Sequence, residues 1–343
     1  MLAFLPALSA TGLRAARDEW MPKISENVGD LKPATLKWLA QIGCRHVVFQ
    51  GTDQVDREKR GYWLRSEIED ARKQCEQAGL TLESMMLPHG FYIKAMLGQP
   101  GRDEQIENIC RCVRAAAEGG VSLIEWRFKP DFYWGDAVGY HTAEGRGGAK
   151  LKAFDYSRVA GAGPLDDVPP ASFEEMWARF RYFAKPVLEA AEKAGVRMTM
   201  HPTDPPVPSM RGVAHVFHHP DNFRRMIAEF PTQACGVTFC QGTITEMGVD
   251  VAKEIRYFGG QGKIYHVHFR NVKGKVPKYT ESFIDEGDMD MLEAMRAYKA
   301  VNYTGPIVSD HTPKLDSDVG FGLIGRSYSH GYIRALIHAA NRM

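Results

Sequence analysis

Short apolar runs of strand type alternate with amphipathic helical stretches along the chain, and this alternation restricts the possible folds more than any other feature. Apolar residues recur every three or four positions in the stretches between the runs, which is typical of helices packed on a core. We expect strands at 23–27, 46–50, 80–87, 121–128, 196–201, 236–241, 263–270 and 306–311. Eight strand–helix units in 343 residues, with no break in composition, predict one α/β domain over 1–343, a (β/α)8 TIM barrel.

An open, doubly wound sheet is the main alternative for such an alternation. That fold would be expected to carry a glycine-rich phosphate turn such as GxGxxG after an early strand, and the sequence has none. The barrel is therefore the expected architecture. Active sites of barrels lie at the carboxyl ends of the strands, so residues in those positions are the first candidates for function.

The segment 130–170 is too long for an ordinary connection between a strand and a helix. It is rich in glycine, shows little periodicity, and contains Trp134, Tyr140 and His141. It would leave the barrel at the carboxyl end of the fourth strand, on the face where active sites lie. We expect it to form a lid over the site, with a surface or dimer-contact excursion as the alternative.

Charge and cysteine content exclude several classes of protein. The chain has 43 Lys and Arg against 42 Asp and Glu. This near-zero net charge does not indicate a protein that binds nucleic acid or a membrane surface. Six cysteines without a CxxC pair are typical of reduced, mostly buried thiols in a cytoplasmic protein. No apolar run approaches the roughly 18–20 residues of a membrane span. We expect the apolar opening MLAFLPALSA to pack across one end of the domain, with the remnant of a trimmed leader as the alternative.

Candidate metal ligands end four consecutive strands of the predicted barrel. His201 ends the fifth strand, Cys240 the sixth and His268 the seventh, while Asp310 and His311 end the eighth. Strands that follow one another in sequence adjoin in a barrel, so these side chains could converge at one mouth. Two imidazoles, a thiolate and a carboxylate suit Mn, Fe, Co or Zn better than Ca or Mg. The sequence therefore predicts a metal site, although any one of these residues alone would be interpreted as structural.

His266 and His268 lie two apart on one strand and therefore point to the same face. His268 is nearer the carboxyl end and is the predicted ligand. His266 would lie deeper in the barrel, as would Glu125 on the fourth strand.

Three cations are expected at the same mouth. Arg127 and Lys129 lie two apart at the end of the fourth strand, and Arg270 follows the seventh. Such a cluster can hold a carboxylate, because a guanidinium binds both of its oxygens. The alternative is a set of internal salt bridges to acids such as Asp204 or Glu281.

At these residues the sequence resembles the mannonate dehydratase family, barrel enzymes of the xylose-isomerase-like type. The similarity runs from about Lys23 to the C-terminal helix and rests on ordered motifs. IKAMLGQPGRDEQIENICR is similar to the family's segment after strand three, RFKPDFYW to its aromatic stretch, HPTDPP to its His-Pro-Asp-Asp-Pro-Pro and FCQGT to its Cys-Gln-Gly. HFRN, GDMDM, SDH and GLIGR follow in the family's order and at similar spacing.

The resemblance implies a metal, usually Mn²⁺, held by His201, Cys240, His268 and Asp310; Fe²⁺, Co²⁺, Mg²⁺ and Zn²⁺ are the alternatives. It also implies acid–base chemistry at Asp310 and His311. The family removes water from a sugar acid to give a 2-keto-3-deoxy acid. The proton α to a carboxylate is very weakly acidic, so the metal and nearby cations must stabilise the charge that develops when it is taken. One group takes this proton and another protonates the leaving C3 hydroxyl, and which residue does which stays open.

Several positions depart from the family pattern. Phe321 stands where the family has a catalytic Tyr, and Tyr328 is the candidate to fill that role. Further departures are Tyr133 in place of Asp, Thr203 in place of an acid, Arg127 in place of Asn, and Lys129 in place of an apolar residue. The metal shell is intact and the residues facing substrate are altered, which indicates a different and more anionic acid. The predicted substrate contacts are Arg270, Arg127, Lys129, Trp134 and Asn271.

Three functions compete on this basis. The first is a metal-dependent dehydratase, a carbon–oxygen hydro-lyase acting on a sugar acid. The second keeps the metal and the α-proton abstraction but isomerises or epimerises a sugar or keto acid. The third is a non-catalytic barrel that binds a sugar acid. The expected partner is a small sugar acid, with a homo-oligomer as an open alternative.

Overall fold

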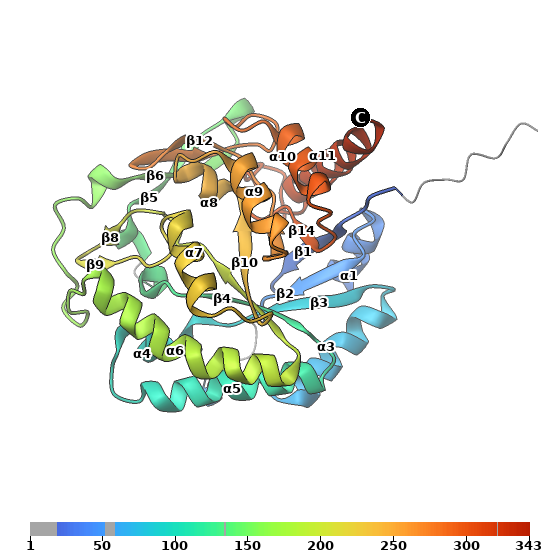
Figure 1. Cartoon of the computed structure of the whole chain (residues 1–343). Coiled ribbons are helices and arrows are strands. Elements are labelled where there is room, and N and C mark those ends of the chain that lie inside the picture. Colours follow the sequence, from blue (N-terminus) through green and yellow to red (C-terminus); the bar gives the residue numbers. More distant parts are fainter. Residues whose placement is uncertain (1–18, 52–58, 134, 321) are drawn as a thin grey trace, which may run out of the picture.

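The computed structural model describes residues 19–51, 59–133, 135–320 and 322–343. Eight parallel strands close into a barrel in the order β1-β14-β11-β10-β7-β4-β3-β2, with helices packed around the outside (Figure 1). The predicted barrel is confirmed, and each of the eight expected strands is present. The barrel strands are β1 (Lys23–Val28), β2 (His46–Phe49), β3 (Thr81–Met86), β4 (Leu123–Arg127), β7 (Arg197–His201), β10 (Cys235–Cys240), β11 (Ile264–His268) and β14 (Pro306–Val308).

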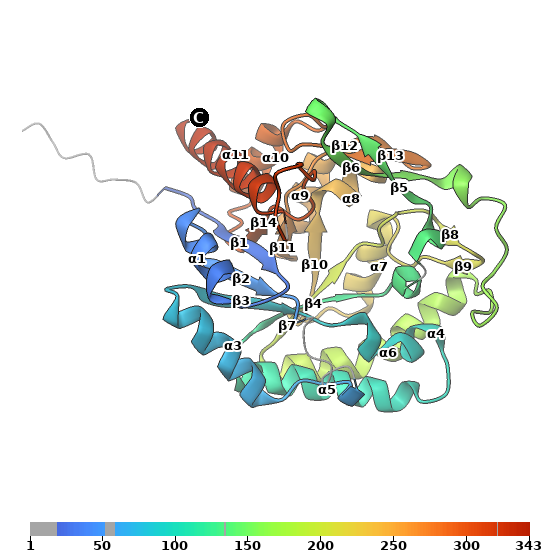
Figure 2. The same ribbon diagram turned by 180° about the vertical axis from the view of Figure 1, so that it is seen from behind.

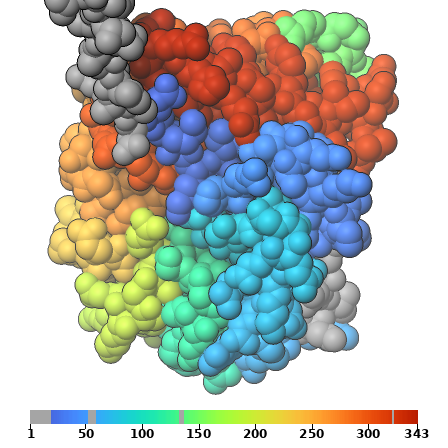
Figure 3. All heavy atoms as spheres, turned by 90° about the vertical axis from the view of Figure 1, so that its right-hand side faces the viewer, coloured from blue at the N-terminus to red at the C-terminus, as the bar shows by residue number. Residues whose placement is uncertain are grey.

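The helices follow the predicted alternation, because each buries one apolar face against the barrel. The N-terminal and C-terminal elements adjoin on the face in Figure 3, as the pairing of β1 with β14 requires. The longer helices are α1 (Pro33–Gln41), α3 (Arg65–Gln77), α5 (Arg102–Glu118), α6 (Phe173–Ala194), α7 (Pro220–Glu229), α9 (Val251–Gly260), α10 (Met291–Ala300) and α11 (Leu323–Arg342), and the short ones are α4 (Ile93–Leu97) and α8 (Gln241–Glu246).

Helix α6 shows how local sequence sets these boundaries. Ser172 begins it with a capping box: its hydroxyl accepts from the Glu175 amide at 3.3 Å, and the Glu175 carboxylate accepts from the Ser172 amide at 2.7 Å. The helix ends at Gly195, whose φ of 69° is in the left-handed region that glycine adopts without steric cost. Its buried face places Phe180 and Phe183 against Trp126 of the barrel.

The segment 130–170 has more structure than its sequence indicated. It forms two strands, β5 (Tyr140–Glu144) and β6 (Lys150–Asp155). These join β12 (Val272–Lys275) and β13 (Lys278–Glu281) in an antiparallel sheet of order β12-β13-β6-β5. We call these four strands the inserted sheet. Figure 2 shows them together at one end of the barrel, near the hairpin of β8 (Ser209–Met210) and β9 (Val213–Ala214).

Two other predictions concern the chain as a whole. All six cysteines are buried and free, which confirms that they form no disulfide framework. Among the described residues, no helix combines the length and the apolar character needed to cross a bilayer. The opening MLAFLPALSA lies outside the described residues, so its expected packing across the domain stays a prediction.

Candidate metal centre and active site

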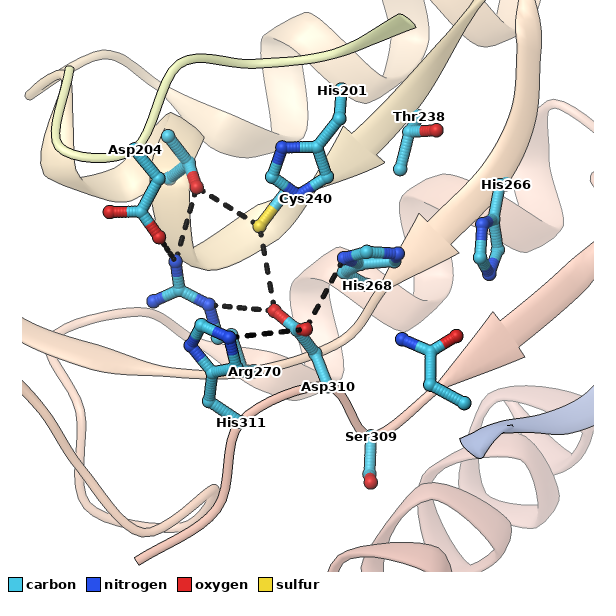
Figure 4. Close-up of polar contacts among 12 residues, drawn as sticks. His201, Asp204, Thr238, Cys240, His266, His268, Arg270, Ser309, Asp310 and His311 are labelled. Carbon is cyan, nitrogen blue, oxygen red and sulfur yellow. Dashed lines mark hydrogen bonds and ion pairs between the residues drawn. The ribbon is translucent and has the colours of Figure 1, made fainter. Parts of the chain in front are cut away.

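The ends of neighbouring barrel strands bring the predicted ligands together. In the parallel register Cys240 lies opposite His268, and His268 lies opposite Val308, two residues before Asp310. The ligand atoms of His201, Cys240 and His268 all lie within 4.8 Å of one another, and all three residues are buried. Figure 4 shows them grouped around the Asp310 carboxylate. The convergence expected from the strand ends is therefore present.

Hydrogen bonds orient both imidazoles of this group. Nδ1 of His201 donates to the carbonyl of Pro202 at 2.6 Å, which leaves Nε2 as the ligand atom. Nε2 of His268 lies 3.1 Å from the Glu125 carboxylate. Nδ1 of His268 is buried without a hydrogen-bond partner among the described residues and lies 3.4 Å from Oδ1 of Asp310. Each histidine thus presents one ring nitrogen to the centre while the other is held from behind.

Asp310 completes the group from the loop after β14. Its Oδ2 lies 3.8 Å from Sγ of Cys240 and accepts from Nε of Arg270 at 2.9 Å. Its φ of 60° is unusual for a residue other than glycine, and such conformations persist where the surrounding contacts enforce them. Burial opposes ionisation of Asp310, but the charges of His311, His268 and Arg270 hold its pKa well below the ordinary value. The carboxylate is therefore ionised at neutral pH.

The residues fit a divalent transition metal. The donor set of imidazole, thiol and carboxylate is the one that such ions prefer. Burial alone would lower the pKa of His268, yet the charges of Asp310 and Glu125 raise it well above the ordinary value. A position whose surroundings attract a proton this strongly also attracts a metal cation. The unpartnered Nδ1 of His268 points to the same conclusion.

Glu125 lies deeper in the barrel than the candidate ligands and contacts several polar side chains. The carboxylate is 1% exposed and lies 3.0 Å from Nδ1 of His266 and 3.3 Å from the Thr238 hydroxyl, in addition to its contact with His268. Nε and Nη2 of Arg127 donate to its other oxygen at 3.2 and 3.1 Å. His266 thus lies deep and shares Glu125 with His268, as the alternation along the strand predicts.

Arg270 links four acids around the mouth, of which Asp310, Glu246 and Glu281 are buried. Besides Asp310, it donates to Asp204 at 2.9 Å and to Glu246 at 2.7 Å, and it lies 3.8 Å from Glu281. Burial and the neighbouring acids raise the pKa of Glu246 to about 8 in spite of Arg270, because one guanidinium cannot offset so many carboxylates. Glu246 is therefore mostly protonated at pH 7, while Arg270 stays paired with Asp310 and Asp204.

A cavity of about 360 Å³ opens beside this cluster. It is lined in part by His311, Lys152, Glu281 and Arg326. The side chain of His311 is 41% exposed, and its Nε2 lies 3.8 Å from Oδ1 of Asp310. A small polar ligand in this cavity would contact His311 next to the predicted metal ligands.

The remaining predicted residues fall into different surroundings. The Arg270 side chain is 2% exposed and makes the internal salt bridges that were the alternative to substrate contact. Lys129 lies 3.5 Å from the buried Asp131. The Asn271 amide binds the backbone of Val272, Ile284 and Met289. For Arg270, Lys129 and Asn271, contact with substrate stays a prediction.

Tyr328 lies at the rim of the mouth rather than among the ligands. It is 45% exposed, and its ring contacts Phe283 and the Arg146 guanidinium. It does not line the cavity beside His311, so its predicted catalytic role has no support from these contacts. Trp134 and Phe321 lie outside the described residues.

Sequence reasoning missed the part played by the inserted sheet. Glu281 was noted only as a partner for salt bridges, and Lys152 was not considered. Nδ1 of His311 lies 3.0 Å from each oxygen of Glu281, and Lys152 donates to Glu281 at 3.0 Å. The alternation of Tyr279 and Glu281 on one face of a short strand was the available signal, but it does not identify the strand's partners.

Comparison with known proteins gives a consistent result. A family model described as D-mannonate dehydratase (UxuA) matches residues 164–343. Mannonate dehydratase 2 of Halalkalibacterium halodurans is 28% identical over 309 residues, which cover 82% of this chain and 89% of the relative.

Solved structures extend the similarity to the fold. The crystal structure of mannonate dehydratase from Streptococcus suis serotype 2 superposes with a TM-score of 0.83 at 26% identity and covers 94% of both chains. A xylose isomerase domain protein from Planctomyces limnophilus superposes with a TM-score of 0.60 at 11% identity, covering 95% of this chain and 98% of that one. The second match shows the fold alone, which is of the xylose-isomerase type.

Proposed function

Because the chain belongs to the mannonate dehydratase family, we propose that it is a metal-dependent hydro-lyase that removes water from a sugar acid to give a 2-keto-3-deoxy acid. The convergence of His201, Cys240 and His268 beside Asp310 is the observation that carries the proposal. The family match favours dehydration over isomerisation or mere binding, since hydro-lyase chemistry defines the family.

We assign the metal to His201 Nε2, Cys240 Sγ, His268 Nδ1 and the Asp310 carboxylate, with Mn²⁺ as the expected ion. When bound, the ion acts as a Lewis acid that offsets negative charge developing on the substrate. The chain's own contribution is to hold these four groups in place. Glu125 fixes His268 from behind, and Arg270 fixes Asp310.

His311 is the residue that we assign to proton transfer. Asp310 is 5% exposed and already bound to Arg270, whereas His311 is exposed to the cavity beside it. A proton donor or acceptor has to reach the substrate within hydrogen-bonding distance, and of these two residues His311 has the open side. Arg127 remains the proposed partner of the substrate carboxylate, because its side chain is 19% exposed beside the ligands.

A turnover screen tests the proposal. The purified protein would be loaded with Mn²⁺ and offered aldonic, uronic and aldaric acids, with 2-keto-3-deoxy acid as the readout. Mass spectrometry would detect isomers of unchanged mass in parallel. A keto-deoxy product that disappears in His311→Ala supports the proposal, with Glu144→Gln on the exposed side of the inserted sheet as a control. An isomer of unchanged mass, or binding without product, would overturn dehydration and leave the fold and the metal site.

A further inference from the structure

The contact between His311 and the inserted sheet has a specific geometry. Nδ1 of His311 lies 3.0 Å from both oxygens of Glu281 on β13. Both residues line the cavity, but 41% of the His311 side chain is exposed and only 7% of the Glu281 side chain. An imidazole whose Nδ1 faces a buried carboxylate keeps a proton on Nδ1 and presents Nε2 to the other side.

Lys152 on β6 fixes Glu281 in turn. Strands β13 and β6 are antiparallel with Thr280 opposite Ala153, so the register sets Glu281 opposite Lys152. The ammonium donates to Oε1 of Glu281 at 3.0 Å and lies 4.0 Å from the centroid of the Tyr140 ring. Nη1 of Arg270 approaches the same Oε1 at 3.8 Å. Oε1 of Glu281 therefore faces two cations as well as His311, whereas Oε2 faces His311.

We propose that the inserted sheet is part of the active site, with Glu281 as the positioning residue that sets the orientation and the protonated nitrogen of His311. Lys152 holds Glu281 in the rotamer that does this. The inference rests on the proposed function, in which His311 moves a proton. It assigns to the sheet a role beyond that of the lid that the sequence predicts.

A single substitution distinguishes a positioning role of Glu281 from simple packing. In Glu281→Gln the amide has one acceptor and one donor, and Lys152 and Arg270 require the acceptor at the position of Oε1. The amide NH₂ then takes the position of Oε2, 3.0 Å from Nδ1 of His311, and it can donate to Nδ1 when the ring carries its proton on Nε2 instead. We expect kcat to fall by ~10²-fold or more, as when the orienting carboxylate of a catalytic histidine becomes an amide.

The double variant supplies the decisive comparison. Lys152→Met removes the nearer of the two cations that turn the amide and leaves only Arg270 at 3.8 Å, so in Lys152→Met/Glu281→Gln the amide can turn and its carbonyl can accept from His311 again. The double variant should recover at least ~10-fold in kcat over Glu281→Gln alone, since the correct donor–acceptor pairing returns. Lys152→Met alone should lose less than Glu281→Gln. Glu144→Gln makes the same chemical change at an exposed position of the sheet and should leave kcat unchanged.

Two further measurements separate the possible outcomes. Bound metal should be unchanged in Glu281→Gln and KM altered by less than ~3-fold, because Glu281 contacts none of the four ligands closely enough to hold them. A loss of activity matched by loss of metal, or no recovery in the double variant, would overturn the positioning role.

Nitrogen chemical shifts of ¹⁵N-histidine in the metal-free protein provide a readout that does not depend on turnover. Nδ1 of His311 should be protonated in the parent chain and unprotonated in Glu281→Gln. If the parent chain dehydrates no sugar acid but this shift is seen, the proposed function fails and the contact stands. If Nδ1 stays protonated in Glu281→Gln, the contact does not set the protonation of His311.

Discussion

Two regions form the wall of the candidate active site, and they hold their side chains in different ways. The barrel strands present His201, Cys240 and His268 from parallel, fully buried backbone, and Cys240 and His268 are 0% exposed. The inserted sheet presents Lys152 and Glu281 from antiparallel strands, and the Lys152 side chain is 37% exposed. The first region is fixed by packing and strand register. In the second region Lys152 and Arg270 hold the Glu281 carboxylate, so the geometry of these side chains depends on charge.

This difference suggests that the two regions serve different tasks, metal binding in the barrel and proton transfer at the inserted sheet. A metal needs several donors held within a few tenths of an ångström, which a closed barrel provides because neighbouring strands cannot shift independently. A proton-transfer residue beside the cavity has to meet substrate as well as protein. His311 stands at the boundary: it follows a barrel strand, and its Nδ1 faces the inserted sheet.

The largest expected effect is on the barrel side. Cys240→Ala removes one proposed ligand from a buried group. We expect bound metal to fall and activity to drop by more than ~10²-fold, because losing a ligand should cost more than losing a residue that only orients a ligand. The fold should persist, because an alanine fits where a small buried side chain stood. Metal content by elemental analysis and the circular dichroism spectrum check both points. Full metal occupancy in the variant would show that Cys240 is not a ligand.

The link between the two regions is Arg270. Arg270→Met leaves Asp204, Glu246 and Asp310 without their shared cation, and breaking a buried ion pair from one side costs ~3–5 kcal/mol. Urea unfolding of the metal-free protein measures the change in free energy. Arg181→Met is the matched control, since its pair with Glu229 is at the surface and is expected to contribute ~0–1 kcal/mol. Equal losses in the two variants would mean that Arg270 does not join the regions.

A substitution at Glu125 tests whether the buried residues next to the proposed ligands contribute to metal binding. Glu125→Gln keeps the size of the side chain but weakens the contact that orients His268. We expect metal affinity to fall by ~10–100-fold with little change in fold, as for other residues behind a metal-bound histidine. Calorimetric titration of the metal-free protein with Mn²⁺ measures it. An unchanged affinity would place Glu125 in the core rather than in the site.

The smallest effect on activity is expected for a residue far from both regions, which serves as a control for the other variants. Glu83 on β3 lies 2.5 Å from Lys23 and 3.1 Å from His46, near the amino ends of the strands. Burial opposes its ionisation, but hydrogen bonds from His46 and Lys23 outweigh this and lower its pKa. Its contribution to stability is therefore present above the ordinary pKa of a glutamate and is lost as the pH falls below it.

Glu83→Gln should accordingly flatten the loss of stability below about pH 4.5, while changing the free energy of unfolding at pH 7 by only ~1 kcal/mol. Urea unfolding at both pH values measures the effect, and activity at pH 7 should not change. A pH dependence identical to that of the parent chain would show that Glu83 is not responsible for it.

Much of the barrel could be predicted from the sequence, because strand runs, helix caps and strand-end residues are local signals. The convergence of the candidate ligands could be predicted since a barrel brings successive strand ends together whatever the loops do. Arg270 and Asn271 show the limit of this reasoning. Their positions at the mouth were predicted, but the salt bridge of Arg270 to Asp204 and the contact of Asn271 with the Ile284 backbone depend on partners 66 and 13 residues away.

The sequence by itself determined the barrel, its eight strands and the order in which His201, Cys240, His268 and Asp310 reach one mouth, because these follow from periods of two and 3.6 residues and from strand order. Only the tertiary structure decided that β6 pairs with β13 and that Lys152 meets Glu281, 129 positions away. Short polar strands carry no local mark of their partner, since the pairing energy arises only when distant segments of the chain meet. The surroundings of His311 were for that reason hidden until the chain was folded.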